Sequence, residues 1–389
     1  MKAPFPWFGG KRDVAPAVWD RFGEGVNYVE PFFGSGAVLL NRPDWTPEMA
    51  RVETVNDADG LLANAWRAIL HDPEATAHYA DWPVNENDLH ARHAHLVAHR
   101  ADVTRRLEGD PEWHDPKLAG WWLWGICCWI GGGWCSGNGP WQTIDGKLVD
   151  TRTEPDLGDA GRGVKRKLVH LGAGRGVSRQ RVHLGAGQGV SRRRVHLGDA
   201  GRGVSRQLVH LSPGQGVHRQ LVHLGNAGRG VAGDGEQGLV AWLTALAERL
   251  ARVRVCCGDW ARVVTDSASG QRMGTTAVFL DPPYSTEADR DMGIYANDSG
   301  TVAHDVREWC IANGNRPQYR IALCGYTGEG HDGLVEDHGW TVHTWSTQGG
   351  MANIGNAAGA VNRHREAIWF SPHCLTLEPN PQQTLWDTE

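Results

Sequence analysis

Short apolar runs alternate with stretches of helical character in the first and last parts of the chain. Runs rich in β-branched and aromatic residues, bounded by glycine, proline or aspartate, predict strands. The predicted strands are 27–30, 52–55, 253–257, 277–280, 319–324, 340–345 and 366–370, the last two forming a closing antiparallel hairpin with a long loop. Helices are predicted over 60–70 and 86–108 and from Leu239 onward, and another is predicted to begin at 37–41.

Because strands alternate with helices, the pattern favours an α/β fold with a mixed, mainly parallel sheet covered on both faces. The final hairpin adds antiparallel strands to it. A chain of 389 residues is long enough for one large or two ordinary domains. Ligands of such sheets bind beyond the carboxyl ends of the strands, so residues directly after predicted strands are the first candidates for function.

Between residues 155 and 237 this pattern gives way to a repeat. Val-His-Leu recurs at 169, 182, 195, 209 and 222, a period of 13 or 14 residues. The period is shorter than that of helical-hairpin repeats, and the unit is too rich in glycine for helices. Short strands joined by glycine turns and an irregular chain both remain open. Duplication copies the five histidines whether or not they act, so we favour an expansion without metal or nucleic-acid chemistry.

Charge is distributed unevenly along the chain. The formal net charge is −6, but residues 157–231 carry 14 Lys or Arg against two Asp, a local net of +12 that leaves −18 for the remainder. A basic segment in an acidic protein indicates a polyanionic partner, although a solvated charge run is equally consistent. Phosphate contacts by this segment would make affinity for nucleic acid fall steeply with salt.

Cysteine spacing and hydropathy set further limits. The eight cysteines include no CxxC pair, so the ligand spacing of a zinc site is missing, and we predict no metal and reduced thiols. The N-terminus is unlike a signal peptide, and no stretch approaches the roughly 18 apolar residues of a membrane helix. The sequence therefore predicts a soluble, cytoplasmic protein with no membrane contact.

The tetrapeptide Asp281-Pro282-Pro283-Tyr284 directly follows a predicted strand. The prolines stiffen the backbone and have no N–H, which leaves their carbonyls as acceptors beside the Asp281 carboxylate. Such acceptors suit an exocyclic amino group on a flat ring. Tyr284 would stack on that ring, an interaction worth roughly 1–3 kcal/mol for nucleobases. The alternative is a tight turn after a strand.

Three further strand ends carry candidate binding residues. Gly34 and Gly36 allow a tight turn and a close backbone approach to a ligand, although a lone GxG motif is weak evidence. Asp57 ends the next strand, where a carboxylate can accept the hydroxyls of a ribose. Asp259, after the strand 253–257, could accept from an adenine amino group. Each carboxylate could instead be a helix cap or a solvated side chain.

The N-terminal stretch Pro6-Trp7-Phe8-Gly9-Gly10-Lys11 places an aromatic ring and a lysine on either side of two glycines. Such a segment could close over a small zwitterion, or it could be a tethered N-terminal turn. The sequence alone leaves both interpretations open.

Taken in order, these motifs resemble those of Dam-like N6-adenine-specific DNA methyltransferases of the α arrangement and DPPY type, which is consistent with a phage-encoded chain. The landmarks are WFGGK at 7–11, EPFFGSG at 30–36, VND at 55–57, GDW at 258–260 and DPPY at 281–284. The resemblance covers residues 1–80 and 238–371. The repeat lies where the family places its variable target-recognition segment. The Trp-rich stretch 121–141, which contains three consecutive glycines and is predicted to end in loops, lacks the family's recognition-loop motif.

The resemblance implies a Rossmann-like S-adenosylmethionine-dependent methyltransferase fold and a division of the chain. The implied parts are 1–85 and 238–371 as two pieces of a catalytic domain, 86–154 as a helical and Trp-rich target-recognition region, 155–237 as the basic insertion and 372–389 as a tail. It also implies double-stranded DNA as the partner and a monomer that acts in a bacterial or phage-infected cell. The implied binding residues for S-adenosylmethionine are Trp7, Lys11, Phe32, Gly34, Gly36 and Asp57, with Asp259 near its adenine.

The activity implied by the resemblance is methyl transfer to N6 of adenine in DNA, as in restriction–modification systems. The base must leave the stack, at about a few kcal/mol, before N6 can meet a methyl donor. N6–H would then donate to Asp281 and to the Pro282 carbonyl, Pro283 and Tyr284 would complete the catalytic set, and direct displacement would follow. Alternatives are methylation of another planar amine, namely cytosine N4, RNA adenine or a glutamine amide, and a catalytically silent DNA-binding protein. The intact motifs argue against the last.

Overall fold

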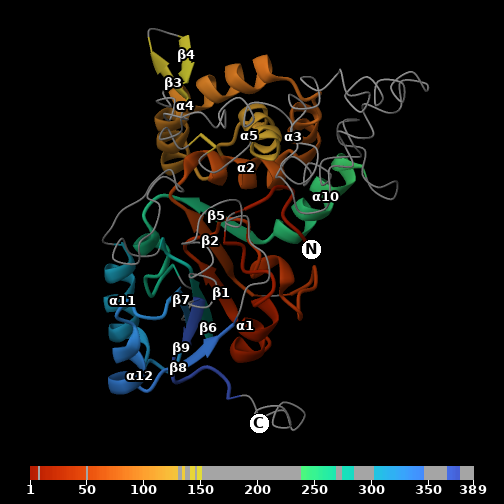
Figure 1. The fold of residues 1–389 in the computed structure, drawn as a ribbon. Coiled ribbons are helices and arrows are strands. Elements are labelled where there is room, and N and C mark those ends of the chain that lie inside the picture. The colour runs from red at the N-terminus through yellow and green to blue at the C-terminus, as the bar shows by residue number, and fades with distance from the viewer. Residues whose placement is uncertain are drawn as a thin grey trace, which may run out of the picture.

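The computed structural model describes residues 1–7, 9–49, 51–129, 134–135, 141–144, 147–150, 238–268, 274–283, 302–345 and 366–376. Within these residues a seven-stranded sheet has the order β5-β2-β1-β6-β7-β9-β8 (Figure 1). Its strands are β1 (Asn27–Glu30), β2 (Glu53–Asp57), β5 (Val253–Cys257), β6 (Thr276–Leu280), β7 (Tyr319–Tyr326), β8 (Thr341–Thr344) and β9 (Glu366–Phe370). The sheet confirms the predicted α/β class.

Strand direction follows the prediction. The strands β5, β2, β1, β6 and β7 run parallel to their neighbours, whereas β9 pairs antiparallel with both β7 and β8. In register, Val29 of β1 lies between Thr54 of β2 and Val278 of β6. A separate hairpin of β3 (Trp141–Ile144) and β4 (Lys147–Asp150) lies beyond the helices at one end of Figure 1.

Both faces of the sheet are buried at its centre, where every residue of β6 is buried, as expected for an interior parallel strand. Successive residues of β6 alternate between two cores: Ala277 and Phe279 belong to one, and Val278 and Leu280 belong to the other. Helix α1 (Ala15–Phe22) packs into the first core. Helices α11 (Val302–Asn313) and α12 (Asp332–His338) pack into the second.

A helical layer lies at one end of the molecule (Figure 1). It comprises α2 (Gly60–His71), α3 (Pro73–Ala80), α4 (Glu86–Gly109) and α5 (Pro116–Cys128), and α10 (Leu239–Leu250) packs beside α2 and α3. Each of the four helices begins where a side chain accepts a first-turn N–H, which is the local signal for a helix start. The capping residues are Asp59, Asp72, Asn85 and Asp115.

Several boundaries differ from the sequence prediction. The helix expected at 37–41 is a short 3₁₀ helix, η1 (Leu39–Asn41). Residues 121–128 of the Trp-rich stretch continue helix α5, because the indoles of Trp122 and Trp124 are buried in the helical layer. Apolar burial thus outweighs the modest helix propensity of tryptophan and glycine. The repeat segment 155–237 lies outside the described residues.

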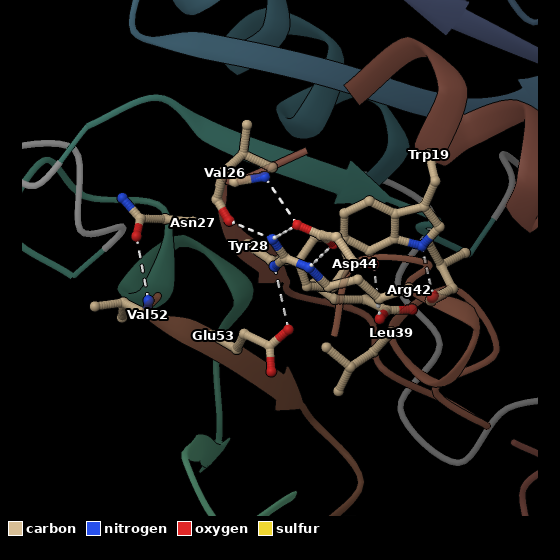
Figure 2. Close-up of polar contacts among 12 residues, drawn as sticks. Trp19, Val26, Asn27, Tyr28, Leu39, Arg42, Asp44, Val52 and Glu53 are labelled. Atoms are coloured by element: carbon tan, nitrogen blue, oxygen red, sulfur yellow. Dashed lines mark hydrogen bonds and ion pairs between the residues drawn. The ribbon is translucent and has the colours of Figure 1, made fainter. Parts of the chain in front are cut away.

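A buried charge network joins the first piece of the chain to the part after the repeat. Glu53 of β2 is almost fully buried and receives Nη1 of Arg42 at 3.2 Å and Nη1 of Arg249, from α10, at 2.6 Å. Figure 2 shows Arg42 reaching Glu53, the Val26 carbonyl and Asp44 together. Both guanidinium groups are therefore paired, which is the condition under which a buried charge is tolerated.

None of the helices in the described part of the chain is both long enough and apolar enough to cross a bilayer.

Candidate active site

The carboxyl ends of β1, β2, β5 and β6 meet at one edge of the sheet, because these strands are parallel neighbours. The loops that leave this edge contain the four strand-end motifs identified in the sequence. They are residues 31–36, 57–59, 258–260 and 281–283. In sheets with helices on both faces, this is the edge where ligands bind.

The loop after β1 turns on two glycines with positive φ, 49° at Gly34 and 62° at Gly36. A Cβ on Gly34 would lie 2.6 Å from Nε1 of Trp7, and a Cβ on Gly36 would lie 2.6 Å from the Phe33 ring. The Trp66 indole also donates to the Gly34 carbonyl at 2.9 Å. Glycine is therefore required at both positions, and the loop is held in one shape against aromatic rings.

Asp57 ends β2 beside this loop. Its carboxylate accepts the Gly34 N–H at 3.0 Å and the Asp59 N–H at 2.9 Å. Burial raises the pKa of Asp57 to about 7, although these two hydrogen bonds act in the opposite direction. The predicted ribose acceptor is thus placed against the predicted glycine turn, with a proton affinity tuned near neutral pH.

Asn56, which we did not select from the sequence, fixes the neighbouring loops. Its side-chain amide donates to the Pro31 carbonyl at 3.1 Å and to the Gly258 carbonyl at 2.9 Å. It thereby ties the loops after β1 and β5 to β2. The residue stands within the VND motif, but its bridging role depends on strand order, which the motif does not contain.

Asp259 is exposed and caps a 3₁₀ helix, η5 (Trp260–Val263), by accepting the Ala261 N–H at 2.8 Å. The capping interpretation considered from the sequence is therefore present. The next residue, Trp260, stacks on Phe32, with ring centroids 6.1 Å apart and an interplanar angle of 27°. This aromatic pair connects the loops after β5 and β1 and leaves both rings only partly buried.

Lys11 and Asp281 meet at the end of β6. The Lys11 ammonium lies 3.0 Å from Oδ2 of Asp281 and also donates to the Gly9 carbonyl at 3.0 Å. Lys11 is 6% exposed, whereas the Asp281 side chain is 23% exposed. The N-terminal WFGGK motif and the DPPY motif, which the sequence suggested separately, are therefore in direct contact.

Two further carboxyl groups lie close to this ion pair. Burial raises the pKa of Glu30 well above its usual value, and the nearby charges of Asp281 and Asp57 add to that effect; Tyr28 Oη donates to Glu30 at 2.9 Å. Burial also raises the pKa of Glu366, with Lys11 opposing and Asp281 reinforcing the shift. Glu366 begins β9 opposite Tyr326, and only the strand pairing brings it to the site.

Of the three DPPY residues after Asp281, the structure describes the two prolines. Pro282 is buried and Pro283 is partly buried directly after Asp281. Tyr284 lies outside the described residues. No group of three or more His, Cys, Asp or Glu side chains within the described ranges is arranged to hold a metal ion.

Comparison with known proteins gives one result. The model of a family described as D12 class N6 adenine-specific DNA methyltransferase matches residues 7–108. The match includes Trp7, Lys11, the glycine loop and Asp57, and it ends before Asp259 and Asp281. No curated protein matches the sequence.

Proposed function

Because the chain belongs, over residues 7–108, to the D12 class N6 adenine-specific DNA methyltransferase family, we propose that it methylates N6 of an adenine held outside the DNA duplex. Family membership itself implies S-adenosylmethionine-dependent methylation of adenine in DNA. The observation that carries the finer proposal is the 3.0 Å ion pair between Lys11, inside the matched residues, and Asp281, far outside them. It joins the matched segment to the DPPY motif at one edge of the sheet.

The residues at this edge suit S-adenosylmethionine. The Asp57 carboxylate is an acceptor of the kind that binds ribose hydroxyls at the end of a β-strand. The partly buried rings of Phe32 and Trp260 offer apolar surface for an adenine, and the exposed Asp259 beside them offers an acceptor for its amino group. Trp7 and Lys11 complete the proposed set from the N-terminal segment. When bound, S-adenosylmethionine supplies a sulfonium methyl group, and its sulfur departs as a neutral thioether.

Asp281 is proposed to act on the target base. Its carboxylate and the Pro282 carbonyl accept hydrogen bonds from N6–H, which draws the nitrogen lone pair out of conjugation with the ring. After N6 forms its bond to carbon it carries one proton too many, and the Asp281 carboxylate is the acceptor at hand. The prolines contribute a fixed backbone without N–H donors. Tyr284 is proposed as the stacking surface for the base.

Lys11 is proposed to position Asp281. The ammonium contacts Oδ2 at 3.0 Å and so fixes the orientation of the carboxylate. Burial and, to a smaller extent, the nearby charges of Asp281 and Asp57 raise the pKa of Glu30. This shift weakens the negative charge that Glu30 adds near the Lys11–Asp281 pair.

For the partner, we propose duplex DNA, met in the cytoplasm of a bacterium or of a phage-infected cell by one copy of the chain. The net charge of +12 over residues 157–231 supports contact with a polyanion. Titration of protein with a duplex in an analytical ultracentrifuge checks the stoichiometry, and a complex with two copies per site contradicts the monomer.

The proposed activity is tested with purified protein, tritiated S-adenosylmethionine and unmethylated duplex DNA, followed by digestion to nucleosides. We expect label in N6-methyladenine. Label in N4-methylcytosine, or in RNA or protein supplied in parallel reactions, identifies one of the other planar amines instead. The Asp281→Ala variant is expected to bind S-adenosylmethionine and to transfer no methyl group. A wild-type preparation that binds S-adenosylmethionine but leaves every DNA unlabelled contradicts the proposal.

A further inference from the structure

A cavity lies in the helical layer, away from the sheet edge. Its volume is about 620 Å³, a size typical of small-molecule sites. The lining comes from α3, α4, α5 and the segment between α3 and α4. It consists of His78, Tyr79, Asp81, Trp82, Asp88, Ala91, Arg92, His95 and Trp121. Aromatic rings thus make much of the wall, with one arginine and two carboxylates among them.

Arg92 is the unusual member of this lining. It is 8% exposed, and its Nη1 is enclosed with no hydrogen-bond partner among the residues that the structure describes. Among the described residues, the guanidinium contacts the faces of three indoles. Its Cζ atom lies 4.3 Å from the ring centroid of Trp124, 5.2 Å from that of Trp82 and 5.3 Å from that of Trp121. Burial lowers the pKa of Arg92. Cation–π contacts use the face of a guanidinium and not its N–H groups, so they leave hydrogen-bond donors of Arg92 available.

The surroundings hold Arg92 in this position. Trp124 is fixed by its own hydrogen bond to the Trp82 carbonyl at 2.8 Å. Asp88 lies one helical turn before Arg92 on α4, but within the described residues the two side chains form no ion pair. Asp88 Oδ2 instead accepts from the Asn85 amide at 2.7 Å and from the Trp82 indole. The guanidinium and the carboxylate therefore line one cavity as separate polar groups.

From this arrangement we propose that the cavity binds a guanine base. The flat ring would lie against the indoles, which stack with any base. The forked donors of Arg92 match O6 and N7 of guanine, the commonest specific arginine contact to a base. The carboxylate of Asp88 matches the N1–H and amino donors on another edge of the same base. Adenine offers Arg92 only one acceptor on its corresponding edge, because its position 6 carries a donor.

Charge argues against a phosphate as the ligand. Two carboxylates, Asp81 and Asp88, line the cavity with the single charge of Arg92. Burial lowers the pKa of His95, which keeps that imidazole neutral near pH 7. A dianion would therefore meet more negative than positive charge, whereas a neutral base with donors and acceptors meets both. The guanine could belong to DNA or to a free nucleotide.

The test is calorimetric titration of the full chain with dGMP, dAMP and inorganic phosphate, without S-adenosylmethionine. We expect dGMP to bind at least about tenfold more tightly than dAMP, within the range of one bidentate base contact, and phosphate not to bind. The analogue 7-deaza-dGMP removes the acceptor for Arg92, and dIMP removes the amino donor for Asp88. Both should bind more weakly than dGMP. Equal binding of dGMP and dAMP, or no binding of dGMP, overturns the proposal.

Variants on α4 make the location specific. Arg92→Lys keeps the charge but loses the fork, and it should abolish the preference for dGMP. Because Arg92 is buried, its replacement could disturb the fold, so a second variant is made at an exposed position of the lining. Ala91→Phe should fill the cavity and block the binding of dGMP. Ala98→Phe, also exposed on α4 but not in the lining, is the matched control. Wild-type dGMP binding in Ala91→Phe would place the site elsewhere and overturn the proposal.

A competition experiment identifies the source of the base. A short thymine strand with one guanine is expected to displace dGMP if DNA provides the ligand, whereas an all-thymine strand is not. If neither strand competes, the ligand is a free guanine nucleotide. Since no step of this test uses methyl transfer, its failure would leave the proposed catalytic function untouched, and an inactive enzyme could still bind dGMP.

Discussion

The Lys11 ammonium lies 3.0 Å from Oδ2 of Asp281, and this contact links the first residues of the chain to the strand end that follows the repeat. Lys11 is almost fully buried, and its second partner is the Gly9 carbonyl within its own segment. The lysine is therefore held on one side by its own glycine turn and on the other by the proposed catalytic carboxylate. A substitution of Lys11 should consequently alter the position of the Asp281 carboxylate.

We expect Lys11→Met to reduce single-turnover methyl transfer by about tenfold to a hundredfold, the rate equivalent of losing one hydrogen bond to a charged group, about 1.5–3 kcal/mol. Methionine keeps an unbranched apolar side chain but removes the ammonium. The rate is measured by rapid quench at saturating S-adenosylmethionine. Lys2→Met, at an exposed position of the same segment, is the control. If the variant binds S-adenosylmethionine more weakly but has a normal rate at saturation, then Lys11 contributes to cofactor binding and not to the positioning of Asp281.

The affinity for S-adenosylmethionine is expected to depend on pH through Asp57. The pKa of this carboxyl is raised to about 7, and only its ionised form accepts ribose hydroxyls through both oxygens with the strength of a charged acceptor. The dissociation constant should therefore be about tenfold larger at pH 6 than at pH 8, with little change at higher pH. Calorimetry across this range measures it. Asp57→Asn should bind weakly without the pH step, and a step that persists in this variant contradicts the assignment.

The raised pKa of Asp57 also makes the free energy of unfolding depend on pH. Here the contribution of Asp57 is larger at low pH, whereas the affinity for S-adenosylmethionine is larger at high pH. An unfolded Asp has a pKa of about 3.9, so between about pH 4 and 7 the folded state binds the proton more strongly. The contribution of Asp57 to the free energy of unfolding is therefore fully present below about pH 4 and is lost as pH rises through 7. Urea titrations of wild type and Asp57→Asn without ligand should converge at low pH and diverge toward pH 8, with the variant relatively more stable there.

The sequence predicted this edge of the sheet because strand ends can be identified from local patterns. Gly34, Asp57 and Asp281 each follow an apolar run, and parallel strands place such residues at one edge. The contacts among them were not predictable in the same way. That Asn56 bridges two loops depends on the order of strands in space. The cap formed by Asp259 is a local contact, and the sequence had left it open as an alternative.

The helical layer shows a second limit of local patterns. The sequence indicated only that the Trp-rich stretch 121–141 ends in loops, and burial of indoles makes its first residues, 121–128, part of α5. Arg92 was indistinguishable from the other charged residues of its helix, because cation–π contacts come from Trp82 outside α4 and from Trp121 and Trp124 on α5. Tertiary packing decided both outcomes.

Deletion of residues 157–231 is expected to weaken the dependence of DNA affinity on salt. Each phosphate contact contributes a slope of about −0.9 in log affinity against log salt, and the segment carries 14 basic residues. Fluorescence anisotropy with a labelled duplex between low and moderate salt gives the slope. A chain of full length with these residues changed to glutamine separates charge from length. An unchanged slope in both proteins would mean that the segment does not touch DNA.

Replacement of Glu53 by glutamine is expected to destabilise the fold by about 3–5 kcal/mol, the usual result of removing one partner from a buried ion pair. Arg42 and Arg249 would be left in the interior without their shared carboxylate, although Arg42 keeps Asp44. Because Arg249 comes from α10, the substitution should also weaken the packing of the part of the chain after the repeat against the first part. Urea unfolding followed by far-ultraviolet circular dichroism measures the change. Asp102→Asn, which breaks exposed pairs with Arg105 and Arg106 on α4, should cost less than about 1 kcal/mol. Equal, small losses in the two variants would show that the interior network adds no more stability than a surface pair.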